Sequence, residues 1–254
     1  MNVRDIKGLR SIMGFEGEYA VFKAKDSEGP YQGVINRKGE IVWDAKLFPP
    51  TLRVRGTNIY MSCIRGKKDL HYYDVALQQY VEKPERKIEG RDSYEDMKEL
   101  DAKWVEKEGS IFSEVGRLTD NLLKFRTDKI EEIYGIMTED GKILIEPQYK
   151  YIIPNNDSAN HFVVVLPNDM YGVIDLKGNT TLPFEYEHLF FRGNFYVARK
   201  DGKAGIIDLE GNILIPFDYE ALHPSYDEGL DLISAKKDGE FIFINAKQER
   251  VELF

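Results

Sequence analysis

Four histidines and one cysteine are the side chains of this sequence best suited to metal binding or nucleophilic catalysis. The histidines are His71, His161, His188 and His223, and no two of them have the close spacing of a local zinc motif. His188 and His223 follow equivalent strands, but solvated loop histidines are commoner than ligands. Cys63 has no nearby histidine to activate its thiol, so we expect a small buried hydrophobic residue there. These residues predict no metal site and no cofactor.

The carboxylates and glycines give no catalytic motif either. Asp and Glu together number 44, and any pair chosen from them as a glycosidase-like acid and nucleophile would be arbitrary. The sequence contains no GxSxG elbow, no Walker phosphate loop, no GxGxxG and no HExxH. We therefore predict no catalytic residues and a protein that is not an enzyme.

The most regular feature of the chain is an internal repeat. Residues 172–189 and 205–222 are identical at eleven of eighteen positions, and residues 135–152 form a third copy. Weaker copies begin at Gly33, Tyr72 and Phe241. In the cleanest copy, residues 194–200, 203–208 and 212–217 have the composition of short strands. Asp201-Gly202 between the first two favours a type I′ hairpin, and Pro216 either ends the third strand or places it at a sheet edge. The pattern predicts antiparallel meanders.

Aspartates recur at one position of this repeat, which we call the turn position. Asp, Asn and Thr share no acid–base chemistry, but each accepts a hydrogen bond from the backbone two residues on. The glycine that follows supplies the left-handed conformation that closes the turn. We therefore predict that these residues build turns: Asn36, Asp74, Thr138, Asp175, Asp208 and Asn245, followed by Gly39, Gly141, Gly178 and Gly211.

Tyr149, Tyr186 and Tyr219 also recur at one register of the repeat. We expect each of them to pack between neighbouring units with its hydroxyl at the edge. Stacking on a ligand is the alternative.

The repeat lapses over residues 84–131, a charged insertion that predicts a helix over about residues 93–108. Ser93 with Asp96 resembles a capping box, and Gly109 is a stop signal. Tyr94, Met97, Leu100 or Asp101, and Trp104 fall on one face, which favours packing on the repeats over binding a partner. Residues 111–118 resemble a decayed copy, with Ser113 at the turn position.

These patterns predict an all-β fold of tandem three-stranded antiparallel meanders with one inserted helix. The parts are N-terminal degenerate repeats (1–83), the insertion (84–131) and C-terminal repeats (132–254), in one continuous array. Six or seven units can stack as an open superhelical array or close into a propeller-like ring. The C-terminal strand finishes its own unit, which favours an open or loosely closed array.

The pattern G-[VI]-I-D-x-x-G-x-x-[LI]-[IL]-P-x-x-Y resembles the WG (or KWG) repeat family of bacterial proteins over residues 133–245. The residue before the key glycine is Tyr134, Tyr171, Ala204 or Gln32, where the family has tryptophan. The resemblance implies an all-β scaffold that serves as an interaction module, with no agreed catalytic residues.

Composition narrows the range of partners. A net charge of −9 argues against nucleic acid, and no apolar run is long enough for a transmembrane helix. The single cysteine and the polar N-terminal segment favour the cytoplasm.

We expect recognition to lie in the connections between units, because loops on a rigid scaffold carry most binding sites. The leading hypothesis is a non-enzymatic protein that binds another macromolecule, and a protein is the favoured class of partner. One alternative is an immunity or antitoxin protein that neutralises a basic effector, which the acidic charge suits. Another is binding to a carbohydrate or cell envelope through aromatic side chains. The candidate residues are Tyr151, Phe190, Phe191, Arg192, His223 and Tyr226.

Overall fold

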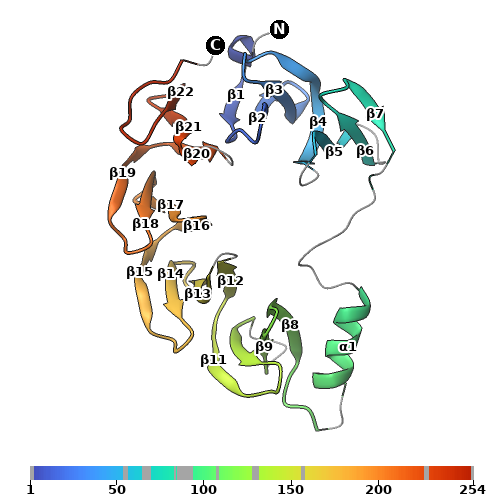
Figure 1. The fold of residues 1–254 in the computed structure, drawn as a ribbon, viewed down its shortest axis with the longest axis vertical. Coiled ribbons are helices and arrows are strands. Elements are labelled where there is room, and N and C mark those ends of the chain that lie inside the picture. The colour runs from blue at the N-terminus through green and yellow to red at the C-terminus, as the bar shows by residue number, and fades with distance from the viewer. Residues whose placement is uncertain are drawn as a thin grey trace. The chain divides into compact units, whose positions relative to one another are not determined.

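The computed structural model consists almost entirely of antiparallel strands in small sheets, with one α-helix (Figure 1). It describes residues 3–53, 57–64, 70–82, 84, 94–106, 109–127, 132–155, 158–225 and 229–252. The chain divides into two compact units, which we call unit 1 (Met1–Lys87 with Asp218–Phe254) and unit 2 (Ile88–Phe217). The predicted three-part division of the chain stays a prediction.

Unit 2 contains the helix α1 (Tyr94–Trp104) and sheets of four strands each. The first sheet consists of β8 (Glu114–Thr119), β9 (Leu122–Arg126), β10 (Tyr134–Thr138) and β11 (Ile143–Tyr149). The second consists of β12 (Tyr151–Asn155), β13 (Ser158–Val165), β14 (Tyr171–Asp175) and β15 (Thr180–Tyr186). The third consists of β16 (His188–Arg192), β17 (Phe195–Lys200), β18 (Lys203–Asp208) and β19 (Ile213–Tyr219), which crosses the unit boundary.

Unit 1 begins with the short 3₁₀ helix η1 (Val3–Asp5) and a seven-stranded sheet. Its strands are β1 (Leu9–Ile12), β2 (Tyr19–Asp26), β3 (Gly29–Asn36), β4 (Ile41–Arg53), β5 (Ile59–Ile64), β6 (Leu70–Asp74) and β7 (Gln79–Val81). Because β4 pairs with both β3 and β5, this sheet is two four-stranded sets that share one long strand. The last sheet contains β20 (Ala221–Ser225), β21 (Gly229–Lys237) and β22 (Glu240–Ile244).

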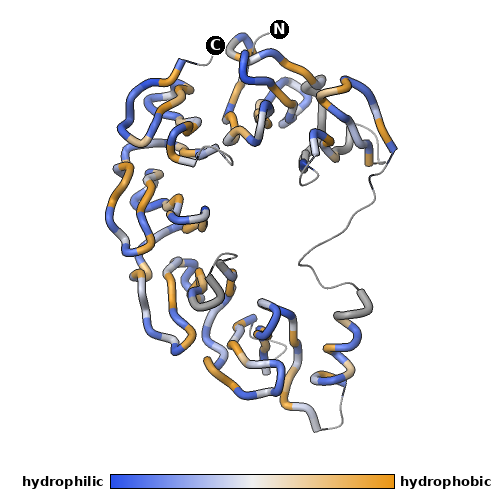
Figure 2. The backbone as a smooth tube through the Cα atoms, in the orientation of Figure 1, coloured by the Kyte–Doolittle hydropathy of each residue, from blue (hydrophilic) through white to orange (hydrophobic). Residues whose placement is uncertain are grey.

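The sheets of unit 2 have four strands each, so the predicted three-stranded unit is wrong. The additional strands are β12 and β16 in unit 2, with β20 at the same place in unit 1, and they lie where connections were predicted. Figure 2 shows hydrophobic residues along the strands of every sheet, and the inner strands β10, β14 and β18 are buried at successive residues, so both of their faces are covered. The prolines of β12 and β20 are tolerated because both are edge strands, which need no complete ladder. Whether the array is open or propeller-like stays a prediction.

The structure confirms that the turn position builds turns. In Asp175 and Asp208, Oδ1 accepts the backbone N–H two and four residues on, at 2.7–3.0 Å. Asn36 and Asn245 do the same, and Asp74 accepts the N–H of Ala76. Thr138 differs, because its hydroxyl accepts the N–H of Lys142. The glycines at the ends of these turns have φ between 72° and 92°.

In four of these turns the side chain four residues after the turn position makes a hydrogen bond with the side chain at the turn position. Asn179 and Asn212 donate Nδ2 to the carboxylates of Asp175 and Asp208, both at 2.8 Å. Where the turn position holds asparagine the roles are exchanged, and Asn36 donates to Glu40 at 2.7 Å. The hydrogen bond from Asn212 lowers the pKa of Asp208, so this contribution to stability is lost only as the pH falls below the ordinary aspartate range.

This exchange gives a direct test of the turn assignment. Asp208→Asn should lower the melting temperature, because the new amide faces the Nδ2 of Asn212 with no acceptor for it. Adding Asn212→Glu should restore the melting temperature by recreating the pair that Asn36 and Glu40 make. Thermal unfolding followed by circular dichroism measures both variants. A double variant no more stable than Asp208→Asn would contradict the assignment.

Helix α1 packs on the sheet β8–β11, as predicted. Leu100 is buried in one cluster with Val115, Leu123, Phe125 and Met137, and Trp104 lies against the same cluster. The predicted place of Met97 on this face is wrong, since its side chain is 54% exposed. The helix ends at Trp104, before Gly109, whereas Ser93 and the side chains of Tyr94 and Asp96 lie outside the described residues.

The segment 84–131 also contains the strands β8 and β9, which were not predicted because the segment is highly charged. Ser113 does not occupy a turn position. Its hydroxyl donates to the carbonyl of Arg126 at the start of the β8–β9 hairpin, and the turn of this sheet is at Thr138. Residues 114–118 therefore belong to β8, the first strand of a unit, and the segment 111–118 is not a decayed copy of a third strand. The side chain of Cys63 lies outside the described residues.

The repeated tyrosines pack between neighbouring sheets. Tyr149 and Tyr186 are buried, and their rings stack on Phe184 and Phe217 of the following sheets at centroid distances of 6.3 and 6.4 Å. Tyr219 is buried as well, and its hydroxyl donates to Oε1 of Gln248 at 3.3 Å. Because so little of their ring surface is exposed, these side chains serve packing.

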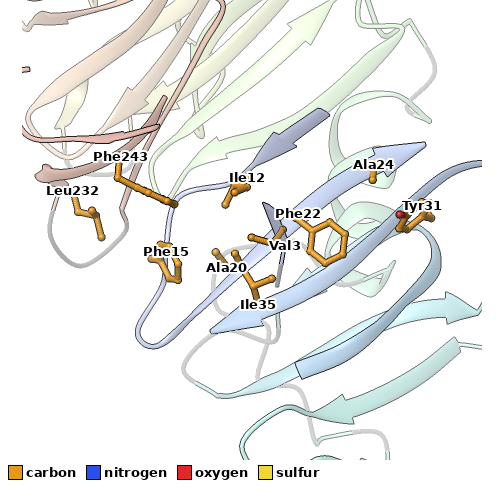
Figure 3. Close-up of a cluster of buried hydrophobic side chains, with 10 residues drawn as sticks. All are labelled: Val3, Ile12, Phe15, Ala20, Phe22, Ala24, Tyr31, Ile35, Leu232 and Phe243. Carbon is orange, nitrogen blue, oxygen red and sulfur yellow. The ribbon is translucent and has the colours of Figure 1, made fainter. Parts of the chain in front are cut away.

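In unit 1 the last sheet shares a core with the first. Figure 3 shows Leu232 and Phe243 of the C-terminal strands beside Ile12 and Phe15, and these side chains belong to one buried cluster. Two buried hydroxyl groups of the last sheet also make hydrogen bonds across this contact. Ser225 donates to the carbonyl of Phe15 at 3.0 Å, and Ser234 donates to that of Ile12 at 2.8 Å.

Candidate functional site

The strands β12, β16 and β20 each pair with the second strand of their sheet, and the residue that precedes each of them adds one more hydrogen bond to this pairing. The N–H groups of Lys150, Glu187 and Glu220 donate to carbonyls of the second strand of the sheet, each at 2.8 Å. Their side chains add ion pairs: Glu220 with Lys236 at 2.7 Å, and, with the charges reversed, Lys150 with Asp169 at 2.5 Å. This residue therefore fixes where each first strand begins.

Two of the first strands of unit 2, β12 and β16, are edge strands with exposed apolar side chains. Tyr151, Ile153 and Phe190 are 52%, 45% and 49% exposed. Ile153 and Phe190 occupy the same repeat position, eighteen residues after Gly135 and Gly172. The two strands belong to neighbouring sheets, and β13 and β14 of the sheet β12–β15 contact β16 of the sheet β16–β19. We call these three side chains the first-strand surface.

The other predicted site residues lie elsewhere. Phe191, next to Phe190 along β16, is half-buried and packs on Tyr196 at a centroid distance of 5.5 Å. Arg192 ends β16 and is half-buried. His223 is half-buried in β20 of unit 1, where it pairs with Ser234. Tyr226 lies outside the described residues.

The predicted placement of these residues in loops is wrong, whereas their role in binding stays a prediction. Tyr151, Phe190, Phe191, Arg192 and His223 all lie in strands, so their neighbours alternate between the two faces. Sequence reasoning also missed Ile153. The repeat could have identified this residue, because aligning the repeats by their glycines places Ile153 at the position of Phe190.

Carboxylates are absent from all three of these strands. The sequences YIIPN, HLFFR and ALHPS contain no Asp or Glu, although the chain carries 44 acidic residues. His188 at the start of β16 has a pKa lowered by partial burial and by the charge of Arg199, so it is neutral at neutral pH. The first-strand surface is therefore aromatic and aliphatic, without the negative charge of the rest of the protein.

A hollow of about 300 Å³ lies elsewhere in unit 2, beside the strands β15, β18 and β19. It is lined by the stacked rings of Tyr186 and Phe217, by Ile213 and by the charged groups of Asp201 and Lys203. Among the residues with described positions, no group of three or more His, Cys, Asp or Glu side chains is placed to hold a metal ion. Within the same residues, no helix has the length and apolarity needed to cross a membrane.

A model of the WG containing repeat matches residues 134–160, 171–203 and 205–241. Each match includes a third strand, its turn position and the fourth strand that follows. Residues 134–241 are WG repeats. In these WG repeats the name-giving tryptophan is replaced by Tyr134, Tyr171 or Ala204. The Tyr134 hydroxyl donates to Glu114 at 3.0 Å, and burial together with this carboxylate raises its pKa.

The glycine of each WG repeat lies beneath the fourth strand of its sheet. A Cβ atom on Gly135 would lie 2.4 Å from the carbonyl oxygen of Ile145, and one on Gly172 would lie 2.7 Å from the ring of Phe184. The strand register shifts at the same place, between Tyr134 and Ile136. The WG repeat therefore needs glycine because the fourth strand comes close to it, through backbone atoms at Gly135 and through the Phe184 ring at Gly172.

No curated protein matches the sequence of this WG repeat chain. Among solved structures, Kluyveromyces lactis Hsv2p is similar at 9% identity with a TM-score of 0.37, covering 94% of this chain and 75% of that one. Kluyveromyces marxianus Hsv2 is similar at 8% identity with a TM-score of 0.35, covering 95% and 74%. PorZ, a surface component of the type IX secretion system of Porphyromonas gingivalis, is similar at 10% identity with a TM-score of 0.40, covering 97% and 32%. No function follows from similarities at these TM-scores.

Proposed function

We propose that this protein is a non-enzymatic binding protein that recognises a protein partner through its first-strand surface. One observation carries the proposal. Tyr151, Ile153 and Phe190 expose half of their large apolar side chains on the edge strands of neighbouring sheets. Burying such side chains against a partner removes them from water, which is the main source of affinity in most protein interfaces.

The scaffold supports this function by holding the surface in place. The first strands are hydrogen-bonded into sheets whose inner faces are buried, so little conformational entropy is lost when a partner binds. The positions that recur between the repeats of this chain serve turns and packing, which leaves the first strands, whose residues differ between repeats, for recognition. We further propose that the protein acts in the cytoplasm, where Cys63 stays a thiol.

The test compares two sets of exposed apolar residues on opposite edges of unit 2. After a partner has been identified by pull-down, the variant Tyr151→Ser/Ile153→Ser/Phe190→Ser should weaken its binding by at least about thirtyfold, since central aromatic residues each contribute about 2 kcal/mol. The control is Leu209→Ser/Ile213→Ser/Leu214→Ser, which changes exposed residues at the β19 edge. Calorimetry measures both dissociation constants. Unchanged binding in the first variant, or loss in the control alone, would contradict the proposal.

A second candidate function is saccharide binding in the hollow beside β15, β18 and β19. Aromatic rings flanked by Asp201 and Lys203 offer both an apolar face and hydrogen-bonding groups for hydroxyls. This candidate would be favoured if the unchanged protein binds a saccharide on a glycan array and the Lys203→Gln variant does not. The immunity-protein version of the main proposal needs a basic partner. Because β12, β16 and β20 have no carboxylates, such a partner would have to bind another face.

A further inference from the structure

The backbone of β16 is hydrogen-bonded to its sheet on one side. In the part of the chain that the structure describes, β17 is the only strand that pairs with it, so β16 has an open edge. Arg192 pairs with Phe195 across a two-residue turn, and the residues of such a pair exchange both of their hydrogen bonds. Because the direction of these groups alternates along a strand, Phe190 also bonds to β17. The N–H and C=O groups of Leu189 and Phe191 therefore point toward the open edge.

The equivalent edges of β12 and β20 carry proline. Phe191, Pro154 and Pro224 hold one repeat position, nineteen residues after the glycine of their WG repeat. Both prolines face the open edge of their strand, since the pairing with the second strand alternates in the same way. Proline has no N–H, so neither β12 nor β20 offers a donor to another strand at this position. Of these three first strands, β16 is the one that keeps the donor.

The side chains of β16 suit an apolar strand beside them. Phe190 is 49% exposed on one face of the strand. Leu189 is buried on the other face, in one cluster with Val163 and Val173 of the preceding sheet. A strand added at the edge would place one of its side chains beside the Phe190 ring, where aromatic and β-branched residues pair best. Because β16 contains no carboxylate and the lowered pKa of His188 keeps it neutral, covering this part of the edge buries no charge.

The spacing of the backbone groups at this edge selects the class of occupant. Leu189 and Phe191 each present one donor and one acceptor, two residues apart along an extended chain. Another extended chain presents its own groups at the same spacing, whereas a helix has already bonded its N–H and C=O groups internally. We propose that β16 binds an extended segment of the protein partner as an additional strand, with an aromatic or β-branched residue of that segment beside Phe190. This inference rests on the proposed function, because it specifies how the first-strand surface recognises its partner.

The test compares two substitutions of Phe191. Phe191→Pro removes the N–H and introduces the residue that β12 and β20 already have at this position, so the strand can accommodate it. Phe191→Ala is the matched control, because it removes the ring and keeps the N–H. The probe is a peptide of about ten residues, the length of a long strand, selected on the unchanged full chain from a displayed library of random sequences. Calorimetry should show at least about tenfold weaker binding to Phe191→Pro than to Phe191→Ala, because one carbonyl of the peptide loses its donor.

Hydrogen exchange followed by NMR tests the binding mode in the unchanged protein, so its result does not depend on the folding of either variant. The bound peptide should slow the exchange of the Leu189 and Phe191 amides at least about tenfold. The amide of Phe190 should change less, because it is already bonded to β17. Thermal unfolding of both Phe191 variants confirms that they fold.

Weaker binding to Phe191→Pro together with slower exchange at the two edge amides supports the proposal. Equal affinities of the folded Phe191 variants, or unchanged exchange at Leu189 and Phe191, would overturn it. A selection that yields no peptide, or only peptides that bind Phe190→Ser equally well, would overturn it too. The proposed function fails on a different result, namely unchanged binding of the pulled-down partner to the variant Tyr151→Ser/Ile153→Ser/Phe190→Ser.

Discussion

Replacing Gly14 with alanine should lower the free energy of unfolding by about 3 kcal/mol or more, which corresponds to about 10 °C in melting temperature. In unit 1 the chain at Gly14 passes directly against β20. A Cβ there would lie 2.0 Å from the carbonyl oxygen of Pro224 and 3.1 Å from that of His223. Both obstacles are backbone atoms, so no side-chain rotation relieves the overlap. The substitution should push the first and last sheets apart.

Thermal unfolding and hydrogen exchange measure this effect together. Exchange should accelerate in β1 and in β20, since the hydrogen bonds from Ser225 and Ser234 cross the same contact. Gly116→Ala is the control, because the nearest atom to its Cβ is the flexible Lys124 Cε at 3.1 Å. The control should change stability by no more than about 0.5 kcal/mol. Equal effects of the two substitutions would show that the chain ends do not share a core.

The second large effect is expected at the WG glycine Gly135. A Cβ on Gly135 would lie 2.4 Å from the Ile145 carbonyl oxygen and 2.8 Å from the Pro147 nitrogen. Because these atoms belong to the backbone of β11, Gly135→Ala must displace the strand, at a cost of about 3 kcal/mol. Chemical denaturation of the purified variant measures this cost.

Gly172, another glycine of the WG repeats, provides the comparison. At Gly172 the nearest obstacle is the Phe184 ring, at 2.7 Å, with the Leu182 carbonyl oxygen at 3.0 Å. A ring can move more easily than a strand, so Gly172→Ala should cost less than Gly135→Ala. If Gly172→Ala were more destabilising than Gly135→Ala, ring packing and not the backbone of the crossing strand would be the reason that this position requires glycine.

The turns and the strands beside them could be predicted from the sequence because their signals are local. Asp201 and Gly202 both have positive φ, 51° and 73°, as a type I′ hairpin requires. Pro216 lies on an edge strand, although β19 continues past it to Tyr219. Each of these features depends on a few neighbouring residues, so comparing the repeats was sufficient to find it.

The first strands could not be predicted because no turn signal separates them from the preceding strand. Only Lys150 lies between β11 and β12, and only Glu187 between β15 and β16. Pro154 and Pro224 also argue against a strand unless the strand is known to be at an edge. The site was therefore assigned to loops, and the exposed Ile153 was missed.

The packing of the last sheet on the first could not be predicted for a different reason. Phe15 and Phe243 are in contact although they are far apart in the sequence, and no sequence motif around either residue indicates this contact. Without an alignment of homologues, long-range contacts of this kind have no signal in one sequence. The same holds for α1, whose charged composition predicted the helix but not which sheet it packs on.

Photo-crosslinking tests the binding proposal most directly. The amino acid p-benzoylphenylalanine is placed in turn at Ile153, at Phe190 and, for comparison, at Ile213 on the opposite edge of unit 2. The account predicts one partner protein crosslinked from Ile153 and Phe190, competed by excess unmodified protein, and none from Ile213. The same partner crosslinked from Ile213, with none from the first-strand surface, would contradict it.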